Sequence, residues 1–208
     1  MKNIASNTSN KSWNVNKFQK WMPCPKVQTS HPGLAYFYPL DELIVARKWD
    51  ALHSAIGKNY VCYTIFNNVG EKVFLAVQDK KCQKFYVKIF NFYGNELIHV
   101  KKPFKCCVHK ASVWVPPGNY IGSIKKVGCL FLVRNALGEP LLKIKAQGLC
   151  HYVYDILDGD KVIGVVKWKM AFLDEKNFGL AFPVDMDVSD KAALLGASFL
   201  IGYLKYNI

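Results

Sequence analysis

Acidic residues are scarce in this chain. There are 15 Asp and Glu against 28 Lys and Arg, so the formal charge is +13 over 208 residues. Such an excess suggests a polyanionic partner, either nucleic acid or an anionic membrane surface, and the alternative is a lysine-rich surface that only aids solubility. With 51% hydrophobic and 14% aromatic residues, the composition is that of a folded protein and excludes a disordered chain.

Motifs of bond-making chemistry are also missing. The sequence has no nucleophile elbow, no phosphate-binding glycine loop and no HExxH pair. Its seven cysteines include no CxxC pair, and we expect them to be free thiols in a reducing compartment. A zinc site built from Cys106, Cys107, His99 and His109 would use adjacent cysteines, which is not the usual zinc spacing. We therefore expect a protein that is not an enzyme.

No apolar leader is present. The N-terminus, "MKNIASNTSNKSWNVNK", lacks a signal-peptide core and a Met-Gly start, and the C-terminus lacks a prenylation box. We expect a cytosolic-facing protein. Residues 1–30 are rich in Asn, Ser and Lys and end in "PCPKVQTSHPG", which predicts a disordered polar arm before a domain over 31–208.

The sequence also lacks a long apolar run. The longest candidate, near the C-terminus, is thirteen uncharged residues from Ala192 to Leu204. As a helix it reaches roughly 20 Å, whereas a bilayer core is about 30 Å thick. Its apolar residues cover every face of a helical wheel, which favours burial on every side. Two interpretations stay open, a core helix or a short membrane span. The residues concerned are Ala192, Leu195, Gly196, Phe199, Leu200, Ile201 and Leu204.

A strand-turn-strand pattern repeats along the chain. It occurs at "YTIFNNVGEKVFLAV" (63–77), "YVKIFNFYGNELIHV" (86–100), "LFLVRNALGEPLLKI" (130–144) and, more loosely, "YVYDILDGDKVIGVV" (152–166). The turns carry Asn, Asp and Gly, which tolerate the positive φ of tight hairpins. Further strands are expected at 111–117 and 120–127, while 40–53 begins as a helix or an edge strand. We predict a mainly β protein, a closed antiparallel barrel of about ten to twelve strands around the hydrophobic C-terminal helix.

Several motifs, in order, resemble the phospholipid scramblase family. They are "HPGLAYFYPLDELIV", "VQDKKC", "VPPGNYIGSI" and "DEKNFGLAFPVDMDVSDKAALLGASFLIGYL", and the resemblance covers about residues 31–208. It implies a tubby-like fold, a roughly twelve-stranded barrel around a central helix. It also implies ATP-independent, bidirectional movement of phospholipids between membrane leaflets, usually triggered by calcium.

The resemblance places a calcium-binding segment at residues 174–185. Asp174, Phe178, Leu180 and Asp185 are the candidate ligands, with Phe178 and Leu180 offering only backbone carbonyls. Lys176 holds a position that is normally acidic, which removes a ligand and repels a divalent ion. We therefore expect calcium affinity in the millimolar range or weaker. The alternative is that "NFGLAFP" is a turn and strand whose aromatic residues pack in the barrel.

Family members carry a palmitoylated cysteine cluster before "PPG", and this sequence has Cys106 and Cys107 in "KKPFKCCVHK". Acyl chains beside basic residues hold a protein stably on a membrane. The alternative is two small apolar side chains at the end of a strand. The expected partner is an anionic phospholipid membrane, at the cytosolic face of the plasma membrane, and nucleic acid is not expected. Transport by a helix-filled barrel needs homo-oligomers, bilayer distortion or release of the helix. A membrane-tethered lipid-binding or regulatory module without transport is the alternative function.

Overall fold

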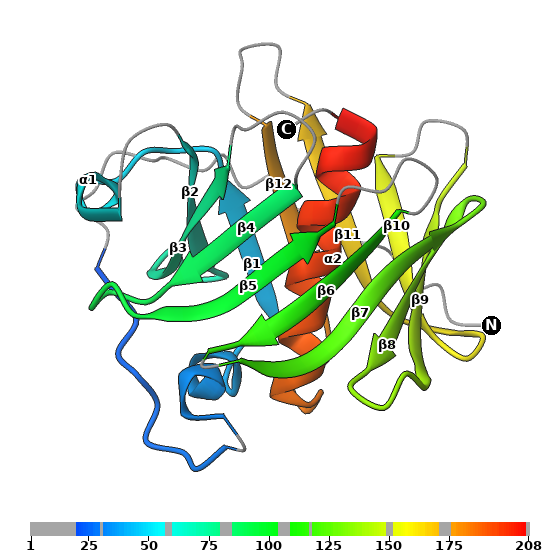
Figure 1. Ribbon diagram of the computed structural model, residues 1–208, viewed down its shortest axis with the longest axis horizontal. Coiled ribbons are helices and arrows are strands. Elements are labelled where there is room, and N and C mark those ends of the chain that lie inside the picture. Colours follow the sequence, from blue (N-terminus) through cyan, green and yellow to red (C-terminus); the bar gives the residue numbers. More distant parts are fainter. Residues whose placement is uncertain are drawn as a thin grey trace, which may run out of the picture.

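Twelve antiparallel strands close into one barrel around a single helix (Figure 1). The computed structural model describes residues 20–29, 31–56, 60–79, 85–103, 109–116, 118–148, 152–170 and 176–206. The strands are β1 (Glu42–Ala46), β2 (Tyr60–Asn67), β3 (Lys72–Asp79), β4 (Phe85–Phe90), β5 (Glu96–Lys102), β6 (Lys110–Val115), β7 (Asn119–Val127), β8 (Leu130–Asn135), β9 (Pro140–Ala146), β10 (Val153–Asp158), β11 (Lys161–Met170) and β12 (Lys176–Ala181). The helices are η1 (Pro32–Phe37), a 3₁₀ helix, α1 (His53–Ile56) and α2 (Val188–Tyr206). The predicted fold class is confirmed.

Each strand pairs with its sequence neighbour, and β1 pairs with β12 to close the barrel. Alternate residues face the interior because side chains alternate along a strand. In β1, for example, Leu43 and Val45 are fully buried while the residues between and beside them are half-buried. The segment expected as a helix or an edge strand therefore begins as the strand that completes the barrel, and α1 follows it.

Three of the hairpins use one turn design. In the first, the Asn67 N–H donates to the Glu71 carbonyl at 3.0 Å, and the Asn67 Oδ1 accepts the Glu71 N–H at 2.8 Å. Gly70 sits between them at φ 84°, where a β-carbon is disfavoured. Asn91 and Asn135 bond their own turns in the same way. The Asn-x-x-Gly spacing thus encodes the turns directly.

The interior of the barrel is filled by α2. Its residues from Lys191 to Gly202 are all buried, so the helix is enclosed, which is one of the two interpretations left open by the sequence. A β-carbon at Gly196 would lie 3.0 Å from Val100 and 3.2 Å from Val113, so glycine lets β5 and β6 approach the helix. Phe199 packs edge-on against Tyr63 and Phe178, with ring centroids 5.2 and 5.4 Å away. Within the described residues, no helix combines the length and the apolarity required to cross a bilayer.

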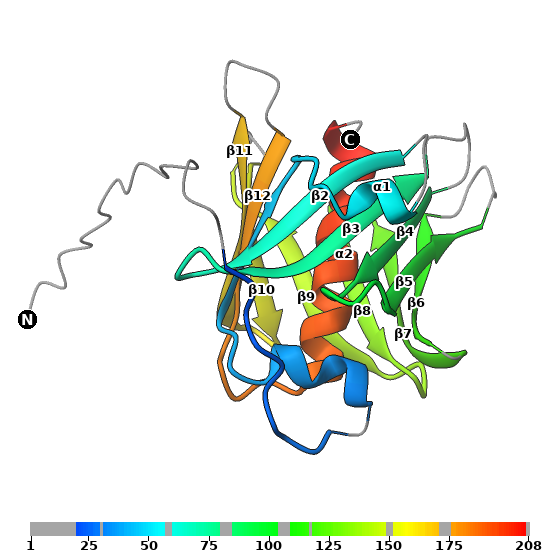
Figure 2. The same cartoon turned by 90° about the vertical axis from the view of Figure 1, so that its left-hand side faces the viewer.

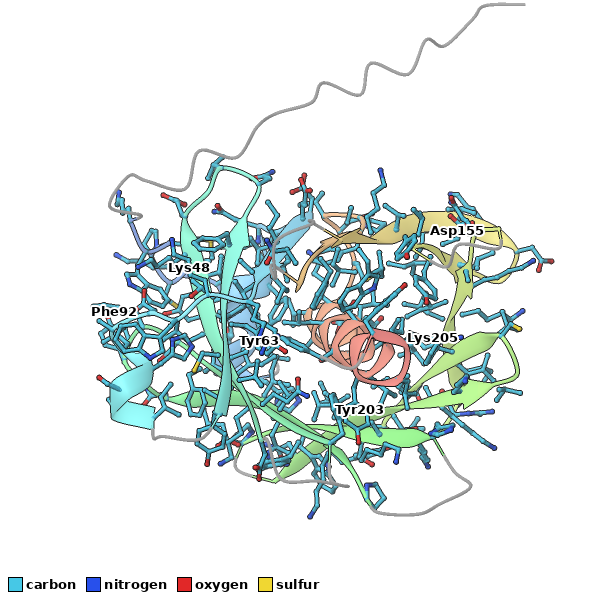
Figure 3. The ribbon with its side chains drawn as sticks, turned by 90° about the horizontal axis from the view of Figure 1, so that it is seen from above. Lys48, Tyr63, Phe92, Asp155, Tyr203 and Lys205 are labelled. Carbon is cyan, nitrogen blue, oxygen red and sulfur yellow. The ribbon has the colours of Figure 1, made fainter. Side chains whose placement is uncertain are left out.

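The two ends of the barrel differ. At the end where α2 begins, η1 lies against the helix and covers it (Figures 1 and 2). We name this the η1 end, and the opposite end, where α2 finishes, the Tyr206 end. Figure 3 looks onto the Tyr206 end and shows Tyr203 and Lys205 on the last turn of the helix, inside the ring of strands. Residues 1–19 of the predicted arm lie outside the described residues. Lys20 and Met22 bond the backbone of Lys72, on the outside of β3.

Candidate membrane-contact site

The residues predicted for the core or membrane helix all lie on α2, inside the barrel. Six of them are buried, and Leu204, in the last turn, is half-buried. The six are Ala192, Leu195, Gly196, Phe199, Leu200 and Ile201. In this arrangement the helix is part of the core, and contact with a membrane falls to the ends and the outer wall of the barrel.

A fully buried lysine fastens α2 at the η1 end. The Lys191 ammonium donates to four backbone carbonyls, those of Phe37 at 3.1 Å, Tyr38 at 3.4 Å, Leu40 at 2.8 Å and Val184 at 2.7 Å. Burial lowers the pKa of Lys191, and nearby aspartates, Asp185 first among them, oppose that change. Since every acceptor is a backbone carbonyl, the ammonium joins the helix to η1, the residues after it and the loop before α2. In the sequence, Lys191 is recognisable only as the residue before the apolar run, and its role was not predicted.

On or beside β5, β6 and β7, three basic side chains face inward at the Tyr206 end. They are Lys102 at the end of β5, His109 just before β6, and Lys126 in β7. Lys102 is 8% exposed. The Lys126 N–H donates to the His109 carbonyl at 2.9 Å, which places those two residues side by side. The pKa of His109 is lowered, first by burial and then by the charges of Lys126 and Lys102. Positive charge is therefore concentrated at this end.

The outer wall over β2, β3 and β4 is covered and electrically balanced. The Lys72 ammonium pairs with Asp50 at 2.6 Å and lies 5.8 Å from the centre of the Trp21 ring. On β4, Lys88 pairs with Glu96 of β5 at 2.6 Å. The His53 ring accepts the Asp50 N–H and approaches the Tyr63 carbonyl at 3.2 Å, which holds α1 against the wall.

The outer wall over β6 to β9 is basic instead. Lys110 lies opposite Lys125, Lys125 opposite Leu132, and Leu132 opposite Lys143. Opposed residues in a sheet point to the same side, so the three lysines form one line across four strands, which we name the lysine row. All three are exposed, and no ion pair in the described part of the chain includes them. Like charges directly opposite each other destabilise a sheet, so fold stability does not account for Lys110 and Lys125.

The calcium candidates are spread over a strand and a loop. Phe178 and Leu180 belong to β12, which is hydrogen-bonded to β1 on one side and β11 on the other, and their side chains are buried in the core. Asp185 is exposed in the loop before α2. Asp174 and the side chain of Lys176 lie outside the described part of the chain. A strand with ladders on both sides is extended, whereas a calcium loop bends to turn several oxygens inward. Phe178 and Leu180 are therefore in extended backbone, and the calcium site stays a prediction because Asp174 lies outside the described residues.

Only the flanking residues of the predicted acylation segment can be placed in the structure. Cys106, Cys107 and Lys105 lie outside the described residues. The flanking lysines are described, and they diverge: Lys101 is exposed on the outer wall, whereas its neighbour Lys102 faces inward. Strand alternation could have predicted this, since Lys102 has the same parity as Ile98 and Val100, which are buried.

This fold and the comparisons with known proteins define one class. A family model described as Scramblase matches residues 22–207, and the chain belongs to this family. Among curated relatives, phospholipid scramblase 1 of Mus musculus is 31% identical over 90% of this chain and 68% of its own length. Phospholipid scramblase 2 of Bos taurus is 30% identical over 90% of this chain and 76% of its own length. The predicted family resemblance is confirmed.

A solved structure of a protein from Arabidopsis thaliana resembles the barrel. The TM-score is 0.52, and the alignment covers 79% of this chain and 93% of that one. Its sequence is only 10% identical, so this likeness shows the fold alone.

Proposed function

We propose that the protein is a phospholipid scramblase, which moves phospholipids between membrane leaflets in both directions without ATP and without making or breaking covalent bonds. The observation that carries this proposal is the family match over residues 22–207, together with relatives that bear the name phospholipid scramblase. No step of this function needs a nucleophile or a general base, which agrees with the absence of catalytic motifs in the sequence.

The proposed partner is an anionic phospholipid membrane, at the cytosolic face of the plasma membrane. The lysine row supports this partner because its three charges lie on one face, and no carboxylate in the described part of the chain is paired with them. Each lysine near an anionic surface contributes about 1 kcal/mol of binding. Acylation of Cys106 and Cys107, which follow β5 in the sequence, would add a second anchor. We expect Cys106→Ser with Cys107→Ser to release the protein from cell membranes.

The membrane partner is tested by neutralising the lysine row. The variant Lys110→Gln, Lys125→Gln, Lys143→Gln should bind phosphatidylserine vesicles about 100-fold more weakly, from about 1 kcal/mol per lysine. Its control is Lys26→Gln, Lys48→Gln, Lys161→Gln, which removes the same charge from three other exposed positions. Equal weakening in the two variants would show that net charge, and not this face, determines binding.

One observation favours a second function, that of a membrane-tethered module without transport. The barrel interior is occupied by α2 along its length, with the residues from Lys191 to Gly202 buried. A filled barrel has no lumen for a headgroup, so transport requires homo-oligomers, local bilayer distortion or release of the helix.

Lipid flip in defined liposomes separates the two functions. Purified protein is reconstituted with a fluorescent phospholipid, and the signal protected from a membrane-impermeant quencher is followed with and without calcium. Loss of that signal supports the scramblase. Stable protection, with vesicle binding intact, supports the tethered module.

Calcium enters the proposal as a weak ligand. We expect affinity in the millimolar range or weaker, since Phe178 and Leu180 belong to a strand and Lys176 replaces an acidic ligand. Calorimetric titration of the full chain checks this, and micromolar binding would contradict it.

A further inference from the structure

The inward-facing end of β5, β6 and β7 gathers three cationic or titratable groups on one side of the barrel wall. Lys102 follows the exposed Lys101, and Lys126 lies between the exposed Lys125 and Val127. His109 precedes the exposed Lys110 and is joined to Lys126 by the 2.9 Å backbone hydrogen bond. By alternation all three side chains face the interior, at the end where α2 finishes. Opposite Lys102 is Phe85, whose ring lies 4.9 Å from that of Tyr203 on the helix.

These groups have no counter-charge within the described part of the chain. The ion pairs found there, Lys72 with Asp50 and Glu96 with both Lys88 and His99, all lie on the outer wall. The charges that act on His109 are those of Lys126 and Lys102, and both are positive. On the nearby last turn of α2 the charged group is Lys205, a further cation. Lys102, Lys126 and Lys205 therefore bring positive charge to this corner from β5, β7 and α2.

Hydrogen bonding is equally incomplete here. His109 Nδ1 is buried and has no partner, and it is one of only two such side-chain atoms among the described residues. The other, Trp168 Nε1, is at the same end of the barrel, where the Trp168 ring packs 4.7 Å from that of Tyr206. Lys102 is more than nine-tenths buried, and no hydrogen bond from it is found within the described residues. A buried polar nitrogen without an acceptor is costly, so a group rich in acceptors fits this corner.

We propose that Lys102, His109 and Lys126 form a site for a phosphate group. A phosphate has several acceptor oxygens for donors that arrive from different strands, and its negative charge offsets the positive charge of the two ammonium groups. The group comes either from a phospholipid headgroup or from free phosphate, and the chemistry of recognition is shared. The site goes beyond the proposed function, because it assigns a binding role to one end of the barrel whatever the mode of lipid transport.

The negative end of the α2 dipole is the competing explanation for these lysines. It accounts for cations near Tyr206 in general. It leaves the His109 Nδ1 without a hydrogen-bond partner and predicts no ligand, so a binding measurement distinguishes the two.

The experiment follows His109 in the full chain by NMR. Its imidazole signals are assigned by their loss in His109→Gln, and its pKa is measured with and without inorganic phosphate. A bound phosphate stabilises the imidazolium, so the pKa of His109 should rise on binding. We expect Lys102→Met to weaken phosphate binding at least tenfold, and Lys126→Met to do the same. Lys101→Met is the matched control, because it removes the neighbouring charge from the outer wall, and it should bind as the parent does.

A second arm uses dihexanoylphosphatidylcholine below its micelle concentration. A rise in the pKa of His109 with this lipid but not with phosphate identifies a headgroup phosphodiester, and the reverse identifies free phosphate. No change with either ligand overturns the proposal, as does equal weakening by Lys101→Met and Lys102→Met. Neither arm contains a bilayer, so failure here is distinct from failure of lipid flip.

Discussion

Among the described residues, two lysines are buried inside this barrel, one at each end, and their surroundings are opposite. Lys191, at the η1 end, is fully buried and donates to four backbone carbonyls. Lys102, at the Tyr206 end, is 8% exposed and has no acceptor among the described residues. A buried lysine therefore stabilises the packing of the helix at one end, whereas the lysine at the other end has no partner among the described residues.

The difference follows from the local backbone. Around Lys191 the chain is irregular: η1 ends at Phe37, and the residues that follow it, like Val184 before α2, turn carbonyls inward. Lys102 ends a strand instead: it pairs with Phe85 of β4, and Lys101 before it pairs with Ser112 of β6, so the neighbouring carbonyls of β5 serve the ladders. Irregular backbone supplies acceptors to a buried cation, and regular sheet does not. The lack of a backbone acceptor for Lys102 among the described residues is the reason why we propose a ligand there.

The largest effect is expected when α2, the helix that joins the two ends of the barrel, is disrupted. Leu195 is fully buried in the middle of α2. Leu195→Asp puts a carboxylate there without a partner and should cost about 5 kcal/mol or more, enough to prevent folding. Solubility and the cooperativity of thermal unfolding are the measurements, with Leu195→Met as the control. A soluble variant that melts cooperatively would contradict the enclosed helix.

The second prediction tests the η1 end alone. Lys191→Met keeps most of the length of the side chain and leaves four inward carbonyls without their donor. We expect a loss of about 3–5 kcal/mol in the free energy of unfolding, as when one partner of a buried charged group is removed. Urea denaturation measures it. Lys205→Met, on the exposed last turn of the same helix, should change it by no more than about 0.5 kcal/mol. If Lys191→Met lowers the free energy of unfolding by less than about 1 kcal/mol, Lys191 does not anchor α2.

The third prediction sharpens the contrast by expecting the opposite sign. Lys102→Met, in buffer without phosphate, exchanges a buried ammonium for an apolar side chain. Such exchanges are often neutral or favourable, so we expect stability unchanged or raised by about 1 kcal/mol. The same urea denaturation compares the two variants directly. If Lys102→Met costs as much as Lys191→Met, the two ends are alike and Lys102 is structural.

The smallest effect concerns the pKa of Asp190, in the first turn of α2. Burial, followed by the charge of Asp187, raises this pKa from 3.8 to about 6. A carboxyl with a raised pKa stabilises the fold while it is protonated, and that stability is lost as pH rises from about 4 to 6. Asp190→Asn should therefore raise the melting temperature by a few degrees at pH 7.5, and less at pH 4.5. The positive end of the helix dipole reduces the difference. An equal change at both pH values would exclude this titration as the cause.

The sequence predicts most of the barrel because its signals are local. The Asn-x-x-Gly turns at Asn67, Asn91 and Asn135 and the alternation around them define hairpins without distant contacts. The run from Ala192 to Leu204 is apolar on every face, which leaves a protein core or a membrane as its environment. The structure has one of them.

The sites are less predictable because they depend on residues far apart in the chain. The carbonyl of Phe37 that binds Lys191 is 154 positions away, and no local pattern indicates such a contact. Lys102 and Lys101 look equivalent in a charge count, and only strand parity separates them. The calcium segment was predicted from the family resemblance alone. The conformation of β12, which lies within that segment, depends on its pairing with β1, which is distant in the chain, and with β11, the strand before it.

The position of α2 after all twelve strands has a consequence for biosynthesis. The ribosome releases the barrel wall before the helix that fills it, and β1 must wait for β12 to close the ring. Until then the inward faces of the strands have no core to pack on, and such exposed apolar faces bind chaperones or aggregate. Folding of this domain therefore ends only after synthesis has passed α2, and a premature stop within the helix should leave a nascent chain that is degraded.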